Sequence, residues 1–206
     1  VEREGIKCDL ERRGRVIGAN TREHFKDMEQ KAEDLNRIIG VGAKLIPRGE
    51  QHREVGSDFY HGGMVIEQAA KLHPSLFHKG LLDACHKAGV TLCSDTKVKK
   101  INGTVGKYTL VTSKGTSQAE QVIVATNGYT DNLSPNLRRR IVPISSQIIA
   151  TEELPEDLAA ELIPNGRTIS ESGRITSYYR LLPGNRRVMF GGRARFNSVP
   201  PDLSAT

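Results

Sequence analysis

The spacing of apolar residues changes along the chain and predicts both helices and strands. From Phe25 to Ile39, apolar residues recur at steps of three and four, which is typical of one face of an amphipathic helix. Thr21 is suited to the N-cap of this helix, and Gly40 or Gly42 to its C-terminal end. A second stripe of the same kind predicts a helix with one buried face from Pro74 to Ala88.

Strands are predicted where apolar residues alternate with polar ones or run together between turn residues. The continuous apolar run Val122–Ala125 is typical of a strand that is buried on both faces. We expect one mixed sheet, with the helix at 25–39 packed nearby, to contain Val105–Thr112, Ile141–Thr151, Ser177–Leu182 and Arg187–Phe190. The other predicted elements are a helix at Pro155–Leu162 and strands at Arg15–Gly18, Val90–Leu92, Lys97–Ile101 and Gln121–Thr126. Residues 47–72 have the glycine content of a loop.

Composition limits the classes of protein to which this pattern can belong. The chain has 206 residues, of which 37% are hydrophobic and 26% are charged, and its well-spaced apolar runs exclude a disordered protein. Its longest apolar run has only a few residues, so no membrane span is expected. Three cysteines without a Cys-x-x-Cys pair indicate a reduced, cytoplasmic protein. Because helices and strands mix and the later strands come in runs, the fold class is α/β to α+β.

The formal net charge of +6 raises the question of a nucleic-acid partner. The basic run at 138–140 has no interleaved aromatic residues on which bases could stack, so we interpret the charge as a solvated surface and expect no nucleic acid. The six histidines lack the spacing of metal ligands, so no metal site is expected. The chain has no Gly-x-Ser-x-Gly motif, and no catalytic acid or base is assigned.

The order of several short motifs is more specific than any one of them. They are His73-Pro74, Gly80-Leu81, Ala88-Gly89-Val90, Thr96-x-Val98-x-x-Ile101, Thr112-x-x-Gly115, Ala119 and Val122-x-Val124-Ala125-Thr126-Asn127-Gly128. In this order they resemble the D-amino-acid oxidase/glycine oxidase family of FAD-dependent oxidoreductases. The later stretches Arg138–Ile144, Ile149–Glu152, Tyr178–Pro183 and Phe190–Arg193 are similar to the branch of gamma-glutamylputrescine oxidoreductases.

The resemblance implies a central fragment of a longer protein. Proteins of the family open with a Gly-x-Gly-x-x-Gly loop that holds the FAD pyrophosphate and close with a Gly-rich segment that contacts the flavin, and this sequence has neither. The implied fold is part of a Rossmann-like FAD-binding domain plus a mixed or antiparallel substrate-domain sheet with flanking helices. Its interleaved parts would be 1–72 in the substrate domain, 73–130 in the FAD-binding domain, and 131–206 in the substrate-domain sheet.

The resemblance also assigns residues to the cofactor. It places Val98 against the adenine of FAD, and Ala125, Thr126, Asn127 and Gly128 beside the ribose and pyrophosphate. An ordinary core valine and an ordinary exit from strand to loop are the structural alternatives. We expect FAD in the full-length protein, and none in this fragment alone.

The substrate residues implied by the resemblance lie on a strand opposite the flavin. Tyr178 and Arg180 share one face of this predicted strand, where a phenol and a two-point guanidinium donor could hold a carboxylate. Tyr60, with the neighbouring residues 61–63, is a second candidate. The alternatives are a packed tyrosine, a solvated arginine and a surface loop.

Two classes of function therefore remain open for the sequence. The first is part of an FAD-dependent oxidoreductase that oxidises an amine or an amino acid, with hydride transfer to the flavin and hydrolysis of the imine. Its partners would be the small-molecule substrate and the N- and C-terminal portions of the same protein. The second is a non-catalytic remnant of the substrate domain, or a basic module that binds a polyanion.

Overall fold

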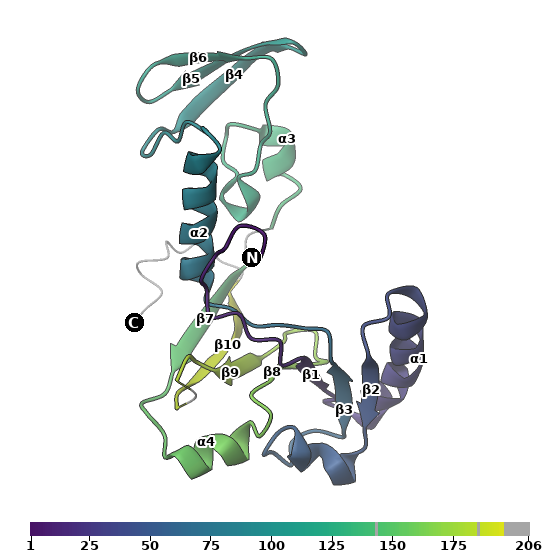
Figure 1. The fold of residues 1–206 in the computed structure, drawn as a ribbon. Helices are drawn as coiled ribbons and strands as arrows, with labels where there is room; N and C mark the ends of the chain where they lie inside the picture. Colours follow the sequence, from purple (N-terminus) through teal and green to yellow (C-terminus); the bar gives the residue numbers. More distant parts are fainter. Residues whose placement is uncertain (143, 185, 196–206) are drawn as a thin grey trace. The chain divides into compact units, whose positions relative to one another are not determined.

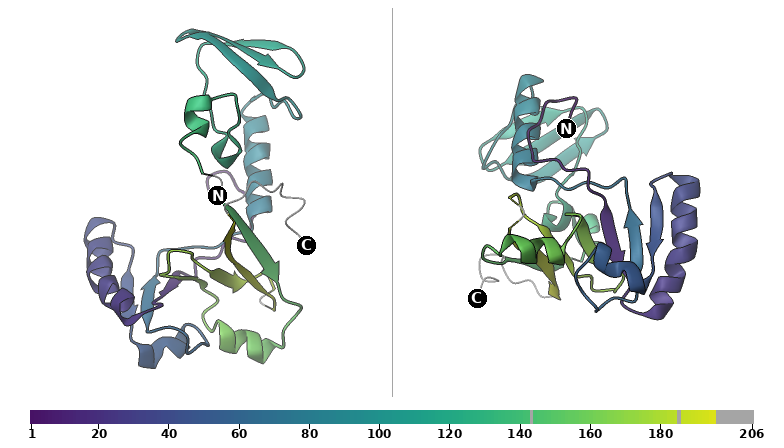
Figure 2. Two further views of the ribbon diagram at one scale, coloured as in Figure 1. Left: turned by 180° about the vertical axis from the view of Figure 1, so that it is seen from behind. Right: turned by 60° about the horizontal axis from the view of Figure 1, so that its bottom comes forward.

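The structure is a computed structural model that describes residues 1–142, 144–184 and 186–195. The chain forms two compact units (Figure 1; Figure 2). Unit 1 consists of Val1–Cys85 and Ser146–Ala194, and unit 2 is built on His86–Ser145. Among the described residues, no helix is long and apolar enough to cross a membrane.

Unit 1 contains a seven-stranded mixed sheet with the strand order β2-β3-β1-β8-β9-β10-β7. Strand β1 runs parallel to β8, whereas the pairs β1–β3, β2–β3, β8–β9 and β9–β10 are antiparallel. The strands are β1 (Arg15–Gly18), β2 (Ala43–Ile46), β3 (Gly63–Ile66), β7 (Ser145–Ala150), β8 (Thr168–Glu171), β9 (Tyr178–Leu181) and β10 (Val188–Arg195). The mixed α/β class and the predicted hairpin of β9 and β10 are confirmed.

One face of this sheet is a buried core, which we call the core face. Val16, Ile169 and Leu181 lie on it, because alternate residues of a strand point to the same side. They pack with Ala159 of helix α4 (Glu156–Leu162) and with Ile163 beyond its end. The short 3₁₀ helix η1 (Arg48–Arg53) precedes Val55 and Tyr60, which also belong to this cluster.

Helix α1 (Arg22–Ile38) forms the second core and lies beside the β2 edge of the sheet (Figure 1). Its buried residues Met28 and Ala32 pack with Met64 of β3. The predicted N-cap is confirmed, since Thr21 Oγ1 accepts a hydrogen bond of 3.1 Å from the His24 N–H. Gly40 ends the helix with φ +70°, a conformation that suits glycine.

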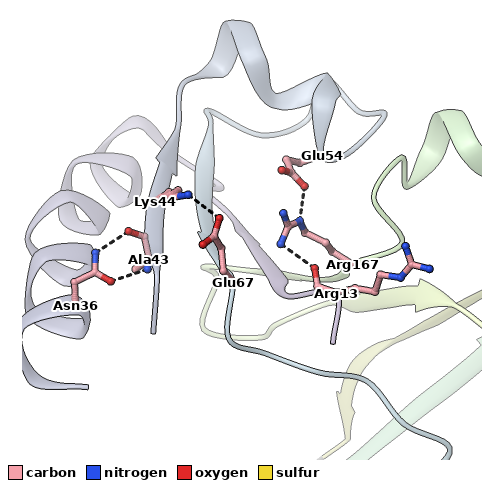
Figure 3. Close-up of polar contacts among 7 residues, drawn as sticks. All are labelled: Arg13, Asn36, Ala43, Lys44, Glu54, Glu67 and Arg167. Carbon is pink, nitrogen blue, oxygen red and sulfur yellow. Dashed lines mark hydrogen bonds and ion pairs between the residues drawn. The ribbon is translucent and has the colours of Figure 1, made fainter. Parts of the chain in front are cut away.

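Polar contacts fix the ends of these elements (Figure 3). The Asn36 amide makes two hydrogen bonds with the backbone of Ala43, of 2.7 and 2.8 Å, and so closes the loop from α1 to β2. Arg167 Nε donates to Glu54 Oε2 at 2.8 Å, and its Nη1 donates to a backbone carbonyl of the segment before β1. Both side chains of this pair are largely buried, so the loss of either one would leave an unpaired charge away from water.

Unit 2 contains a separate three-stranded antiparallel sheet of β4 (Val98–Thr104), β5 (Lys107–Thr112) and β6 (Thr116–Ala119). After it come the 3₁₀ helix η2 (Asn127–Tyr129) and the short helix α3 (Pro135–Arg138). The prediction that Val105–Thr112 belongs to the large mixed sheet was therefore wrong. Very short turns join β4, β5 and β6, so each strand pairs with its neighbour in sequence.

Three further predictions about apolar segments were also wrong. Gln121–Thr126 and Val90–Leu92 are not strands, and Ile123 is 92% exposed. Helix α2 (Pro74–Lys87) forms as predicted, but none of its residues is buried. An apolar segment is buried only where another layer of the fold covers it. No described strand pairs with Gln121–Thr126, so this segment stays outside both sheets.

Candidate cofactor and substrate site

Unit 2 contains a largely apolar cavity of about 400 Å³. The sheet contributes Val98 and Leu110 to its wall, and the segment after the sheet contributes Ala125 and Thr126. Three of the residues that the sequence assigned to FAD, Val98, Ala125 and Thr126, thus lie around one cavity. Asn127 follows in η2 and does not line it, and the same holds for Gly128.

The two charged side chains at this cavity are paired with each other. Lys97, the only lysine or arginine in its lining, forms an ion pair of 2.6 Å with Asp131. Hydrogen bonds from Lys97 and from the Leu133 backbone lower the pKa of the Asp131 carboxyl. The cavity therefore suits a flat, uncharged group such as an adenine ring and offers no free cation to a pyrophosphate. A cavity with contacts for an adenine ring but not for a pyrophosphate is consistent with the absence of the Gly-rich loop from the sequence.

In unit 1, Tyr178 and Arg180 lie on the sheet face opposite the core face, which we call the open face. They are opposite Gly191 and Met189 of β10 in the ladder. Gly191 makes room for the Tyr178 ring, because a Cβ at this position would collide with it. The Tyr178 hydroxyl lies 3.0 Å from Ser146 Oγ, which itself donates to the Gly192 carbonyl, so the phenol is the donor to Ser146.

Arg180 is partly engaged within the protein. Its Nη1 donates a hydrogen bond of 3.0 Å to the Leu72 carbonyl, in the segment before α2. Its Nε is buried and has no hydrogen-bond partner among the described residues. This guanidinium therefore ties β9 to the segment before α2.

Tyr60 is separated from these two residues. It is 2% exposed and belongs to the core-face cluster, where its ring occupies the space that a Cβ on Gly18 would fill. Its hydroxyl lies 3.0 Å from that of Tyr179, the residue between Tyr178 and Arg180. Burial raises the pKa of both phenols, and their hydrogen bond raises that of Tyr60 further. The structure does not bring Tyr60 together with Tyr178 and Arg180.

A second group of polar residues, which sequence reasoning missed, lies on the open face near α1. Arg15 Nε and Nη2 donate to Ser170 Oγ at 3.2 and 2.7 Å. His24 Nδ1 lies 2.7 Å from Ser172 Oγ. Ser170 lies on β8 and Ser172 just beyond its end, so the sequence carried no clear signal for this group. Among the described residues there is no cluster of three or more potential metal ligands.

Comparison with known proteins assigns this combination of a mixed sheet and a separate antiparallel sheet to the FAD-dependent oxidoreductases. A family model described as "FAD dependent oxidoreductase" (DAO) matches residues 1–206. The chain therefore belongs to the DAO family of FAD-dependent oxidoreductases, and the resemblance inferred from its motifs is confirmed.

Two curated relatives cover nearly the whole chain. The gamma-glutamylputrescine oxidoreductase of Escherichia coli (strain K12) is 31% identical over 203 residues, which are 98% of this chain and 47% of that protein. The probable oxidoreductase OrdL of Haemophilus influenzae is 30% identical over 195 residues, 93% of this chain and 45% of that protein. The chain thus spans about half the length of the curated relatives that it matches.

Solved structures share the fold. Glycine oxidase from Geobacillus kaustophilus superposes with a TM-score of 0.74 at 21% identity, over 97% of this chain and 52% of that one. L-proline dehydrogenase from P.horikoshii superposes with a TM-score of 0.71 at 17% identity, over 92% of this chain and 50% of that one. The arrangement of strands is therefore that of part of a DAO-family oxidase.

Proposed function

We propose that residues 1–206 are the central part of a longer FAD-dependent oxidoreductase that oxidises an amine or an amino acid. The observation that carries the proposal is the family match over residues 1–206, combined with coverage of only about half of each curated relative. The relative named gamma-glutamylputrescine oxidoreductase supports an amine as the substrate class. Within this scheme residues 73–130 belong to the FAD-binding domain, and 1–72 and 131–206 to the substrate domain.

The cavity of unit 2 would receive the adenine end of FAD. Val98 and Ala125 supply apolar contact to the ring faces, and neighbouring backbone groups can read the ring edge. Thr126 and the turn that follows it, with Asn127 and Gly128, would lie beside the ribose. The pyrophosphate contacts have to come from a Gly-rich loop outside these 206 residues. When bound, FAD supplies the acceptor for the hydride that leaves the carbon bearing the amine.

The open face of unit 1 would position the substrate. Tyr178 offers an aromatic surface that is held across β10 by its hydrogen bond to Ser146. The Nη2 group of Arg180 has no hydrogen-bond partner among the described residues and could donate to a substrate carboxylate, while Nη1 donates to the Leu72 carbonyl. These residues bind and orient the substrate. Water then hydrolyses the imine product without a catalytic group from this chain.

The test is the colour of the complete gene product that contains residues 1–206. We expect a yellow protein whose visible absorption bleaches when an amine is added without oxygen. The Val98→Asp variant should bind less FAD, because a carboxylate would be placed against the adenine, whereas Val105→Asp on an exposed turn should not. A colourless protein that binds a polyanion column in a salt-dependent way would support the interaction module instead.

A further inference from the structure

The hydroxyl group of Tyr178 is held by a chain of two hydrogen bonds that joins three neighbouring strands. The phenol oxygen lies 3.0 Å from Oγ of Ser146 on β7, and this Oγ donates at 3.1 Å to the carbonyl of Gly192 on β10. A serine hydroxyl has a single proton, and here that proton points to Gly192. The phenol proton of Tyr178 therefore points to Ser146.

This direction decides what the Tyr178 hydroxyl can offer to a ligand. Its proton is engaged, so the phenol oxygen presents a free lone pair, which accepts an N–H group and repels a carboxylate. Hydrogen bonds in a chain also polarise one another, so an oxygen that donates its own proton is a stronger acceptor. The open face thus carries an acceptor at Tyr178, two residues from the guanidinium donor of Arg180 on the same face.

Packing fixes the position of this oxygen as well. The Tyr178 ring lies so close to Gly191 of β10 that a Cβ on this glycine would come within 2.7 Å of the hydroxyl oxygen. Ser146 approaches the hydroxyl from β7, on the far side of β10 in the strand order. A hydroxyl that is held in this way loses little freedom when a ligand binds to it.

The charged groups that surround Tyr178 on the open face are cations. Arg180 is one of them, and Ser170, opposite Tyr178 in the ladder of β8 and β9, accepts two hydrogen bonds from Arg15. Glu171, the next residue of β8, interacts instead with the tyrosine pair of the core face. Beside two guanidinium groups an amine is favoured in its neutral form, which is the form from whose carbon a hydride can leave.

We propose that Ser146 is a positioning residue that makes Tyr178 the acceptor for the substrate's amino group. Ser146 takes the phenol proton, and the phenol oxygen accepts an N–H of the amine. Ser146 acts only through Tyr178 and does not contact the substrate. The inference rests on the proposed function in placing the amine on the open face, and it leaves a substrate carboxylate to Arg180.

Three probes of nearly the same shape test this contact. 2-Aminoisobutyrate carries an amino group and a carboxylate on one carbon. tert-Butylamine has a methyl group in place of the carboxylate, and pivalate has one in place of the amino group. Neither amino probe has a hydrogen on the carbon that bears the nitrogen, so neither can lose a hydride. Their dissociation constants are measured by titration calorimetry on the complete gene product.

The variants change either the acceptor or the residue that positions it. Tyr178→Phe should weaken both amino probes by about 3- to 10-fold, as expected for one hydrogen bond, and leave pivalate unchanged. Ser146→Ala should weaken the amino probes as well, but not pivalate, for which the phenol proton becomes free. Ser146→Thr keeps a hydroxyl group and should restore the binding of the amino probes. Thr116→Ala is the control, because it removes an exposed hydroxyl group from the separate sheet.

The double variant tests whether Ser146 acts through the phenol. In a Tyr178→Phe background, Ser146→Ala should have no further effect on the amino probes. An additional loss of the same size as in the wild type would overturn the proposal. It is also overturned if Ser146→Ala weakens all three probes alike, as a loss of local structure would, or leaves the amino probes unchanged. A wild-type protein that binds neither amino probe overturns it too.

These results are distinguishable from a failure of the proposed function. A gene product that is bleached by amines but behaves in one of the contrary ways keeps the proposed function and loses the role of Ser146. A gene product that never binds flavin loses the proposed function. The probes need no turnover, so the comparison of the Ser146 variants still decides the hydrogen-bond assignment.

Discussion

The hydroxyl oxygens of Tyr60 and Tyr179 lie 3.0 Å apart on the core face of the large sheet. The contact joins the loop before β3 to the middle of β9, two segments more than a hundred residues apart in the sequence. It also fixes which face of the sheet each side chain of β9 occupies. Because Tyr179 lies on the core face, its neighbours Tyr178 and Arg180 lie on the open face.

Tyr60→Phe should therefore reduce stability and leave substrate affinity unchanged. The loss of one hydrogen bond is expected to lower the free energy of unfolding by about 0.5–1.5 kcal/mol. Tyr179→Phe should cost a similar amount, and the double variant little more than either single one, because both changes remove the same contact. Urea unfolding of the three variants is the measurement. A fully additive double variant would contradict a direct contact.

The same pair predicts a dependence of stability on alkaline pH. Folding raises the pKa of both phenols, so the unfolded chain ionises first as the pH rises past about 10. Their contribution to stability is therefore complete below that pH and is lost above it. The free energy of unfolding should fall less steeply between pH 9 and about 11 in Tyr60→Phe than in the wild type. Equal slopes would count against the raised pKa of Tyr60.

Gly191 is predicted to control the position of the Tyr178 ring. A Cβ at this position would collide with the ring, and the Gly191 backbone is not left-handed, so the effect of Gly191→Ala is steric. We expect a loss of about 1–3 kcal/mol in unfolding free energy. Tyr178→Ala should remove most of this penalty when the two changes are combined. Chemical denaturation of the four proteins of this cycle measures the coupling, which would be near zero if the ring lay elsewhere.

Local patterns in the sequence predicted helix α1 with its N-cap and the hairpin of β9 and β10, because these elements depend on neighbours in the sequence. They missed β3 within the predicted loop 47–72. This strand has only four residues, and its partners are β1 and β2, so its own composition carries little signal. The continuous apolar run at 121–126 was misjudged for the opposite reason, since its pattern does not reveal whether a covering layer is present.

In the candidate site, too, the sequence predicted what depends on neighbouring residues and missed what depends on tertiary packing. The motif order predicted Val98, Ala125 and Thr126 together, and they do line one cavity. Strand alternation placed Tyr178 and Arg180 on one face. It could not show which face is the core, so it gave no sign that Tyr60, the second candidate, contacts Tyr179 on the face opposite Tyr178 and Arg180. Arg15 was missed because its partner Ser170 lies on β8, more than a hundred residues further along the sequence.

A polypeptide of residues 1–206 alone is predicted not to retain FAD. The cavity at Val98 supplies contacts for the adenine end, and the sequence contains no loop for the pyrophosphate. Incubation with FAD followed by gel filtration should leave a colourless protein without amine oxidase activity. The complete gene product, treated in parallel, is the control and should be yellow. Flavin that remains bound to the shorter chain after gel filtration would contradict the prediction.

Arg180 is predicted to contribute to substrate binding in the complete flavoprotein. If its guanidinium meets a substrate carboxylate, Arg180→Ala removes a charge-assisted contact from a dry site. The expected loss is about 2–4 kcal/mol, or roughly 30- to 1,000-fold in kcat/KM. Arg180→Lys should recover only part of it, because a single ammonium group cannot replace both the hydrogen bond to Leu72 and the contact with the substrate. Steady-state kinetics with flavin content measured on each variant is the test.

The hydrogen bond from Arg180 to the Leu72 carbonyl provides the competing explanation for such a loss. If the side chain only holds this segment, Arg180→Ala should lower stability and reduce kcat/KM equally for substrates with and without a carboxylate. If it binds the carboxylate, the loss is confined to carboxylate-bearing substrates, while decarboxylated analogues react as before. Comparing an amino acid with the amine of the same carbon skeleton therefore separates the two roles. Unchanged kcat/KM for both substrates, with flavin still bound, would leave Arg180 with its structural contact alone.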